Sequence, residues 1–252
     1  METFLSYIPL DIALIAENFD RFFYGVWMTL NLTVLSLLLG GLLAIPMAIA
    51  RASRHPVLNP MVWSYTYVLR GTPLLVQTYL IYYGLGQFET VRQSWLWDPI
   101  LSSAWWCALI AFTLNTAAYT TELLRGAIVD TPTGEVEAAI ATGHSYRSRM
   151  RRIILPSAFR RAIPAYSNEV IFMLHGSVVA STITLQDILG VGRWLNGRYY
   201  LAYEGFITAA LLYFLIVFAI TRVFRWIERR YLRHLTRRET TMDAPATPEP
   251  TR

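Results

Sequence analysis

Two carboxylates and several other polar side chains lie inside, or at the ends of, strongly apolar stretches of this chain. Glu122 follows the apolar run 104–121, and Glu169 interrupts the run 163–181. An ionisable group within a membrane is costly, so its presence there indicates a function such as binding a cation. We therefore expect a pathway for a polar solute lined by six residues: Asn115, Tyr119, Glu122, Glu169, His175 and Arg70.

The two carboxylates each have a structural alternative. Glu122 could pair with Arg125 or Arg70 instead of meeting a solute, and Glu169 could hold a helix interface. Arg70 itself could pair with a carboxylate, cap interrupted backbone or line the pathway, since it is too costly to face lipid.

Asn115, Thr116, Tyr119 and Glu122 recur at helical spacing and share one face of a predicted helix. Such a polar face requires a partner helix or a water-filled cavity. Its side chains could bind the polar ends of a solute or form hydrogen bonds between helices, and the spacing favours neither.

The composition excludes several kinds of chemistry. All 22 basic residues are arginine, so the chain lacks the lysine that a nucleotide-binding P-loop or a Schiff base requires. No metal-binding cluster or catalytic triad is visible, and we expect no catalytic residue, metal or cofactor. The single cysteine, Cys107, forms no intrachain disulfide and is expected to be a buried apolar residue.

A second polar feature is the interval 137–156, EAAIATGHSYRSRMRRIILP, which is too basic to lie in lipid. Residues 135–141 favour a helix, and Gly143 is expected to end or bend it. A short helix with small residues lets the backbone of another protein approach closely. We therefore predict a docking helix, the alternative being a helix packed on its own bundle.

The elements that position these residues are membrane helices, because 54% of the chain is hydrophobic and its mean hydropathy is +0.37. The fold class is thus predicted to be an all-α integral membrane protein. Arg70-Gly71-Thr72-Pro73 interrupts the second apolar stretch, where Pro73 predicts a kink. The predicted transmembrane helices number five: 26–50, 61–84, 104–121, 163–181 and 205–224.

The arginines between these spans predict the orientation. Seventeen flank one side, four flank the other, and Arg70 is intramembrane. By the positive-inside rule the seventeen are cytoplasmic, so the amino terminus is expected outside, the carboxyl terminus inside and the 137–156 loop in the cytosol.

The regions outside the five spans are expected to have different structures from one another. Residues 1–25 lack the basic region of a secretory signal peptide and are predicted to form an external or interfacial segment. Residues 26–239 form the predicted transmembrane domain, which closes with a basic amphipathic helix. A short helix is expected near 185–189, and residues 240–252 are predicted to be a disordered tail.

These motifs resemble those of a known family. Glu137-Ala138-Ala139, Gly143, Ile153, Leu155 and Pro156 match the EAA loop of bacterial ABC importer permeases at the family's spacing. The similarity extends from about 29 to 233. It is strongest to the polar amino acid branch, notably the M permease subunits of histidine/lysine/arginine/ornithine and octopine/nopaline importers.

The resemblance implies a multi-pass protein of the bacterial inner membrane that does not itself hydrolyse ATP. The implied partners are an ABC ATPase homodimer, a second homologous permease, a periplasmic amino acid binding protein and membrane lipid, with no nucleic acid. The EAA helix enters a groove on the ATPase in that family, which assigns ATPase coupling to Glu137, Ala138 and Gly143. The implied cargo is a polar amino acid or opine, and the two carboxylates favour a basic one.

The chain departs from the branch at one point. Many relatives have Lys-Asp-Thr/Ser after the fourth apolar stretch, whereas this chain has His175-Gly176-Ser177. Gly176 supplies no carboxylate there, which favours substrate contacts from the partner permease. The alternative from another class is an oligomeric, ion-coupled secondary transporter or channel that uses Glu122, Glu169 and His175.

Overall fold

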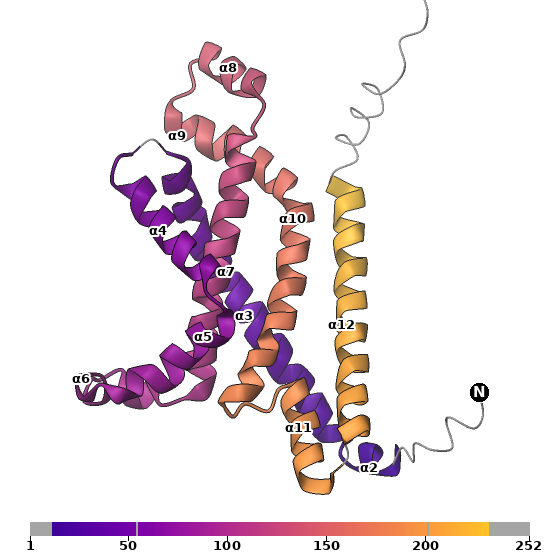
Figure 1. Ribbon diagram of the computed structural model, residues 1–252. Coiled ribbons are helices and arrows are strands. Elements are labelled where there is room, and N and C mark those ends of the chain that lie inside the picture. Colours follow the sequence, from indigo (N-terminus) through magenta and orange to yellow (C-terminus); the bar gives the residue numbers. More distant parts are fainter. Residues whose placement is uncertain (1–11, 54, 201, 232–252) are drawn as a thin grey trace, which may run out of the picture.

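The protein is built from long helices that run between two opposite ends of the molecule (Figure 1). The computed structural model describes residues 12–53, 55–200 and 202–231. Every regular element in these ranges is helical, as the all-α class predicts. The predicted tail 240–252 and positions 1–11 of the predicted amino-terminal segment lie outside the described residues.

The two central helices are α3 (Phe19–Ala52) and α7 (Ala104–Val129). Both extend beyond the predicted spans, and α7 continues through Glu122 into what the sequence indicates as a polar interval. They cross closely at Gly40, where a Cβ would lie 2.3 Å from Cγ2 of Thr116 and 3.0 Å from the carbonyl oxygen of Thr113. Only a glycine permits this approach of the two backbones.

The predicted interruption at Pro73 is confirmed. Helix α4 (Leu58–Gly71) ends before it and α5 (Leu74–Tyr79) begins after it, while Thr72 is extended. Further helical turns cover Leu80–Gly84 and Leu85–Gln87, followed by α6 (Glu89–Arg92) and a turn at Trp97–Leu101. The second apolar stretch is therefore two helical segments rather than one straight helix.

The carboxyl-terminal half contains α10 (Leu155–Gly176), α11 (Ile188–Tyr199) and α12 (Ala202–Tyr231). A 3-10 helix, Ser177–Ile183, continues α10. The prediction of a short helix near 185–189 is wrong in position and length. Asp187 caps α11 by accepting a 2.7 Å hydrogen bond from the backbone nitrogen of Gly190, so the helix begins after this residue.

The core between α3, α7 and α10 has two parts. One is filled by larger side chains, including Leu32, Phe112 and Met173. The other lies toward the carboxyl end of α7 and is lined mainly by small side chains such as Ala44 and Ala158. Small residues in this second part bring the helices close together beside the predicted docking loop.

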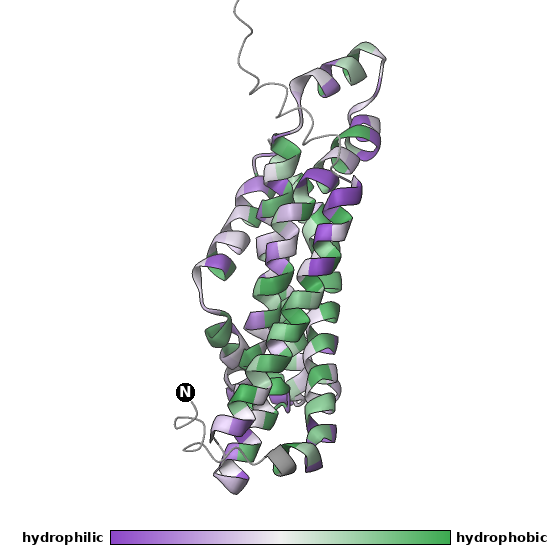
Figure 2. Ribbon diagram, turned by 90° about the vertical axis from the view of Figure 1, so that its right-hand side faces the viewer, coloured by the Kyte–Doolittle hydropathy of each residue, from purple (hydrophilic) through white to green (hydrophobic). Residues whose placement is uncertain are grey.

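Within the part of the chain that the structure describes, two helical segments are each long and apolar enough to cross a membrane, namely Phe19–Ala52 and Tyr203–Tyr231. The pair Tyr146–Ile183 and Ile188–Tyr199, bent by 41°, makes a third if it is one span. Hydrophobic residues dominate the middle of the helical body (Figure 2). The count of five spans stays a prediction.

The ends of the molecule carry different elements (Figure 1). Helix α8 (Thr133–Ala141), α9 (Tyr146–Arg149), the α3–α4 connection and the carboxyl end of α12 share one end. Helices α2 (Ile12–Glu17), α6 and α11 share the other. The elements expected on the same side of a membrane therefore lie together, while the side that faces the cytosol stays a prediction.

Candidate functional site

Helix α8 projects beyond the helical body and presents the predicted docking surface (Figure 1). Glu137, Ala138 and Gly143 are exposed, whereas Ala139 is buried and anchors the helix. Gly143 has φ +77°, and its backbone nitrogen donates to the carbonyl oxygen of Ile140 at 2.9 Å. A left-handed glycine at this position ends the helix in the way the sequence predicts.

The second half of the motif connects the loop to α10. A helical turn at Met150–Ile154 leads directly into α10. Ile153 and Leu155 are half-buried, and Leu155 packs against the small-residue core, while Pro156 is exposed in the first turn of α10. Proline is tolerated there because the first-turn backbone nitrogens have no partner within the helix.

A chain of hydrogen bonds, which we call the Arg161 relay, joins α8 to both α7 and α10. It consists of Glu135, Ser157, Arg161, Thr131 and the carbonyl of Ala127. Ser157 Oγ donates to Oε2 of Glu135 at 3.0 Å, and Nη1 of Arg161 donates to Ser157 Oγ at 2.6 Å. Nη2 of Arg161 donates at 2.8 Å to both the Ala127 carbonyl and Thr131 Oγ1.

Sequence reasoning missed this relay, because Arg161 is one of many arginines in a basic segment and no spacing distinguishes it. Its planar guanidinium presents several donors in a fixed geometry, so it can hold acceptors on two helices at once. A movement of α8 is therefore connected by direct contacts to α7 and α10.

Glu122 lies at the centre of a second polar cluster. Its Oε1 accepts from Nε of Arg51 at 3.0 Å and from Oγ1 of Thr66 at 2.9 Å, and its Oε2 accepts from Nε of Arg125 at 2.6 Å. Nη1 of Arg51 also donates to Oδ1 of Asn59 at 2.7 Å. The pairing with Arg125 is one of the two sequence-based alternatives, whereas the structure records Arg51, not Arg70, as the second cation.

Gln77 caps the interrupted backbone between α4 and α5. Its Nε2 donates to the carbonyl oxygen of Leu69 at 2.7 Å and to that of Thr72 at 3.0 Å. Nδ2 of Asn115 donates to Oε1 of Gln77 at 3.0 Å. Asn115 thus makes the interhelical contact considered from the sequence, and Gln77, rather than Arg70, satisfies the freed carbonyls.

Glu169 is buried, and it accepts a 2.8 Å hydrogen bond from Oγ1 of Thr116 across the α7–α10 interface. The hydroxyl of Tyr119 donates to the Arg70 carbonyl at 3.3 Å, and the Arg70 guanidinium carbon lies 5.2 Å from the centre of the Tyr119 ring. Five of the six predicted pathway residues therefore make direct contacts, which form four separate groups: Asn115 with Gln77, Tyr119 with Arg70, Glu122 with Arg51, Thr66 and Arg125, and Glu169 with Thr116.

Two adjoining cavities connect these groups. One of about 410 Å³ is lined by Arg70, Tyr119, Glu122 and Glu169, among others. The other, of about 400 Å³, is lined by Asn115 and shares Tyr119 and Glu169 with the first. His175 is exposed and lines neither cavity.

The cavities contain opposite charges in a partly apolar setting, which suits a polar or zwitterionic solute. In the described ranges, no group of three or more His, Cys, Asp or Glu side chains could hold a metal ion. The arrangement can bind and orient a solute.

Long apolar helices, two open cavities lined in part by charged residues and a projecting polar helix indicate a component of a membrane transport system. Residues 36–233 match the family described as binding-protein-dependent transport system inner membrane component. The chain belongs to this family, which confirms the resemblance seen in its motifs.

Similar proteins include two permeases. The octopine transport system permease protein OccM of Rhizobium radiobacter is 42% identical over 229 residues, covering 88% of this chain and 93% of that protein. The histidine/lysine/arginine/ornithine transport system permease protein HisM of Salmonella typhimurium is 45% identical over 214 residues, covering 85% of this chain and 91% of that protein.

Solved structures agree with the fold. A crystal structure of an amino acid ABC transporter with histidines has a chain that is 31% identical, with a TM-score of 0.79 over 88% of this chain and all of that chain. An inward-facing structure of the MetNI methionine ABC transporter is 20% identical, with a TM-score of 0.65 over 84% of this chain and 98% of that chain, and shows the fold alone.

Proposed function

We propose that this chain is the permease subunit of an ATP-driven ABC importer that moves a polar, basic amino acid or opine into the bacterial cytoplasm. The observation that carries this proposal is helix α8, which projects from one end of the bundle with Glu137, Ala138 and Gly143 exposed. Its motif is the family's coupling motif, and the Arg161 relay connects it to the helices that line the cavities.

Energy enters from a separate protein in this proposal. The chain has no lysine, so a partner ABC ATPase homodimer hydrolyses ATP in its own nucleotide sites and docks on the EAA loop. A second, homologous permease completes the pathway, and a periplasmic binding protein delivers the solute. The proposed topology has five spans, a periplasmic amino terminus and a cytoplasmic carboxyl terminus, in a multi-pass protein of the inner membrane.

The solute path follows the two adjoining cavities. Glu169 offers a carboxylate that is hydrogen-bonded to Thr116 and lines both cavities, so it is the group proposed to attract a cationic substrate. Glu122 is already paired with two arginines and is proposed to organise the path rather than bind the solute. The names of OccM and HisM support basic amino acids and octopine as the class of cargo.

Uptake by purified protein in vesicles tests the proposal. The chain with its second permease, ATPase and binding protein should accumulate labelled basic amino acids or octopine only when ATP is supplied. A panel that includes acidic amino acids tests the substrate class. If the chain alone moved a solute without ATP, the ion-coupled transporter would be the correct function, and a preference for acidic substrates would contradict the role of Glu169.

A further inference from the structure

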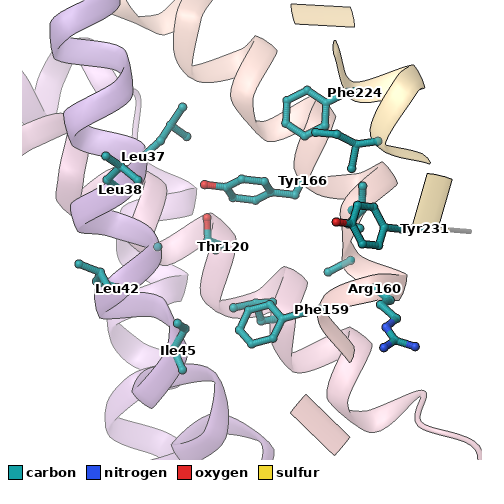
Figure 3. Close-up of a pocket in the computed structure, with 15 residues that line it drawn as sticks. Leu37, Leu38, Leu42, Ile45, Thr120, Phe159, Arg160, Tyr166, Phe224 and Tyr231 are labelled. Carbon is teal, nitrogen blue, oxygen red and sulfur yellow. The ribbon is translucent and has the colours of Figure 1, made fainter. Parts of the chain in front are cut away.

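An apolar groove of about 730 Å³ lies between α3, α10 and α12, on the other side of the bundle core from the polar cavities. Leu38, Gly41 and Leu42 of α3 form one wall, and Phe159 and Tyr166 of α10 form the floor. Figure 3 shows the leucines of α3, the two aromatic rings of α10 and side chains of α12, with the Tyr166 ring extending across the groove toward α3.

The groove is open to the outside of the bundle. Leu38 is 60% exposed and Leu42 is 67% exposed. Helix α12, which also lines the groove, is itself mostly exposed, since only 6% of its most apolar 18-residue stretch is buried. In a membrane the medium around these surfaces is lipid, and fluid lipid chains fill whatever space the helices leave.

The end of the groove nearest α8 is basic. Arg160 lines it there, and Figure 3 shows its guanidinium directed away from the apolar side chains. Among the described residues, no ion pair between Arg160 and a carboxylate is found. Tyr231 of α12, also a lining residue, adds a phenolic hydroxyl. A guanidinium at the end of an apolar groove is complementary to a phospholipid, whose phosphate would pair with the guanidinium while its acyl chain lies in the groove.

The charge at one end of the groove favours a lipid over an apolar helix of a second permease. An apolar helix would leave the Arg160 guanidinium without a negative partner, whereas a phospholipid supplies a phosphate there and an acyl chain for the apolar part of the groove. A Cβ built on Gly41 meets no atom closer than the Tyr166 hydroxyl, at 3.8 Å, so the groove continues over a position without a side chain.

We propose that this groove is a binding site for an anionic phospholipid, with an acyl chain lying beside Gly41 and Tyr166 and the phosphate at Arg160. The assignment of the headgroup to the cytoplasmic leaflet rests on the proposed function, which places α8 in the cytosol. The bound lipid fills the space between α12 and the α3–α10 pair and so stabilises the position of α12.

The amount of lipid that stays bound through purification reports directly on occupancy of this groove. The assembled importer is purified from membranes that contain phosphatidylethanolamine and phosphatidylglycerol, washed in detergent, and its lipids are quantified by mass spectrometry. Wild type should retain phosphatidylglycerol, and Gly41→Phe should lose it because the ring fills the groove. Leu43→Phe, on the exposed surface of α3 outside the groove, is the matched control and should retain it.

The headgroup contact has its own variant. Arg160→Gln should keep a bound lipid but lose the preference for phosphatidylglycerol, whereas Arg147→Gln, in the exposed loop, should keep that preference. Equal retention in wild type and Gly41→Phe would overturn the proposal. An unchanged headgroup preference in Arg160→Gln would overturn the assignment of the phosphate.

If Gly41→Phe does not assemble, photo-cross-linking tests the same site, with a photo-reactive residue in place of Leu42. Cross-linking to phospholipid supports the proposal, and cross-linking to the second permease overturns it. ATP hydrolysis stimulated by the binding protein, measured on the same wild-type preparation, reports separately on the proposed function. Retained lipid without stimulated hydrolysis would contradict that function and leave the lipid site in place.

Discussion

Nε of Arg51 lies 3.0 Å from Oε1 of Glu122, although the two residues are 71 positions apart in the chain. The contact joins the carboxyl end of α3 to α7, and Thr66 brings α4 to the same carboxylate oxygen. Arg125 approaches the other oxygen of Glu122. Three helices therefore share one carboxylate beside the end of the bundle that carries α8.

Glu122→Gln should destabilise this junction. The change removes the negative charge between two arginines, and each lost hydrogen bond to a charged group costs about 1.5–3 kcal/mol. We expect a lower midpoint of thermal unfolding in detergent. The double variant Arg51→Gln/Glu122→Gln should lose less stability than the sum of the two single variants. Glu122→Gln alone leaves the charge of Arg51 without its partner, and removing Arg51 as well removes that unpaired charge. Strict additivity would contradict the pairing.

Gly143→Asp should uncouple the chain from its ATPase while leaving it in the membrane. The side chain places a charge on the docking surface, and the left-handed backbone costs a residue other than glycine about 1 kcal/mol. Binding-protein-stimulated ATP hydrolysis and uptake should both fall. Gly143→Asn, which tolerates this backbone without adding charge, separates the two effects, and full coupling in Gly143→Asp would contradict the docking assignment.

Arg161→Gln should weaken the connection between α8 and the membrane helices. The shorter, neutral amide loses the contacts with Thr131 and the Ala127 carbonyl that the guanidinium makes together. We expect the number of substrate molecules imported per ATP to fall. Arg147→Gln, which changes an exposed arginine of α9 outside the Arg161 relay, should leave the ratio unchanged. An equal effect of both variants would indicate general loss of charge instead.

Glu169→Gln and Thr116→Val separate substrate binding from helix packing. If Glu169 attracts a cation, Glu169→Gln should raise KM for basic substrates much more than Thr116→Val does. If Glu169 only holds the interface, removing either side of the 2.8 Å hydrogen bond should lower stability equally and leave relative substrate preferences unchanged. Uptake of basic and neutral amino acids by both variants provides the comparison.

The sequence was sufficient for the class of protein and for the presence and carboxyl end of helix α8. Hydropathy predicts membrane helices because apolar runs have a length set by the bilayer. The break at Pro73 and the end of α8 at Gly143 follow from backbone restrictions carried by single residues. Such local signals can be read from the sequence without knowing which helices are neighbours.

The tertiary structure decided which polar groups meet. Glu122 takes Arg51 as well as Arg125, Gln77 caps the interrupted helix, and Arg161 joins α8 to two helices. Each of these choices depends on distances between segments far apart in the chain, and arginines are too numerous for spacing to identify the one that is used. The sequence determined the helical class and the ends marked by Pro73 and Gly143, whereas the packing of α3, α7 and α10 decided the extents of the other helices and the contacts between them, because it sets which side chains come within hydrogen-bonding distance.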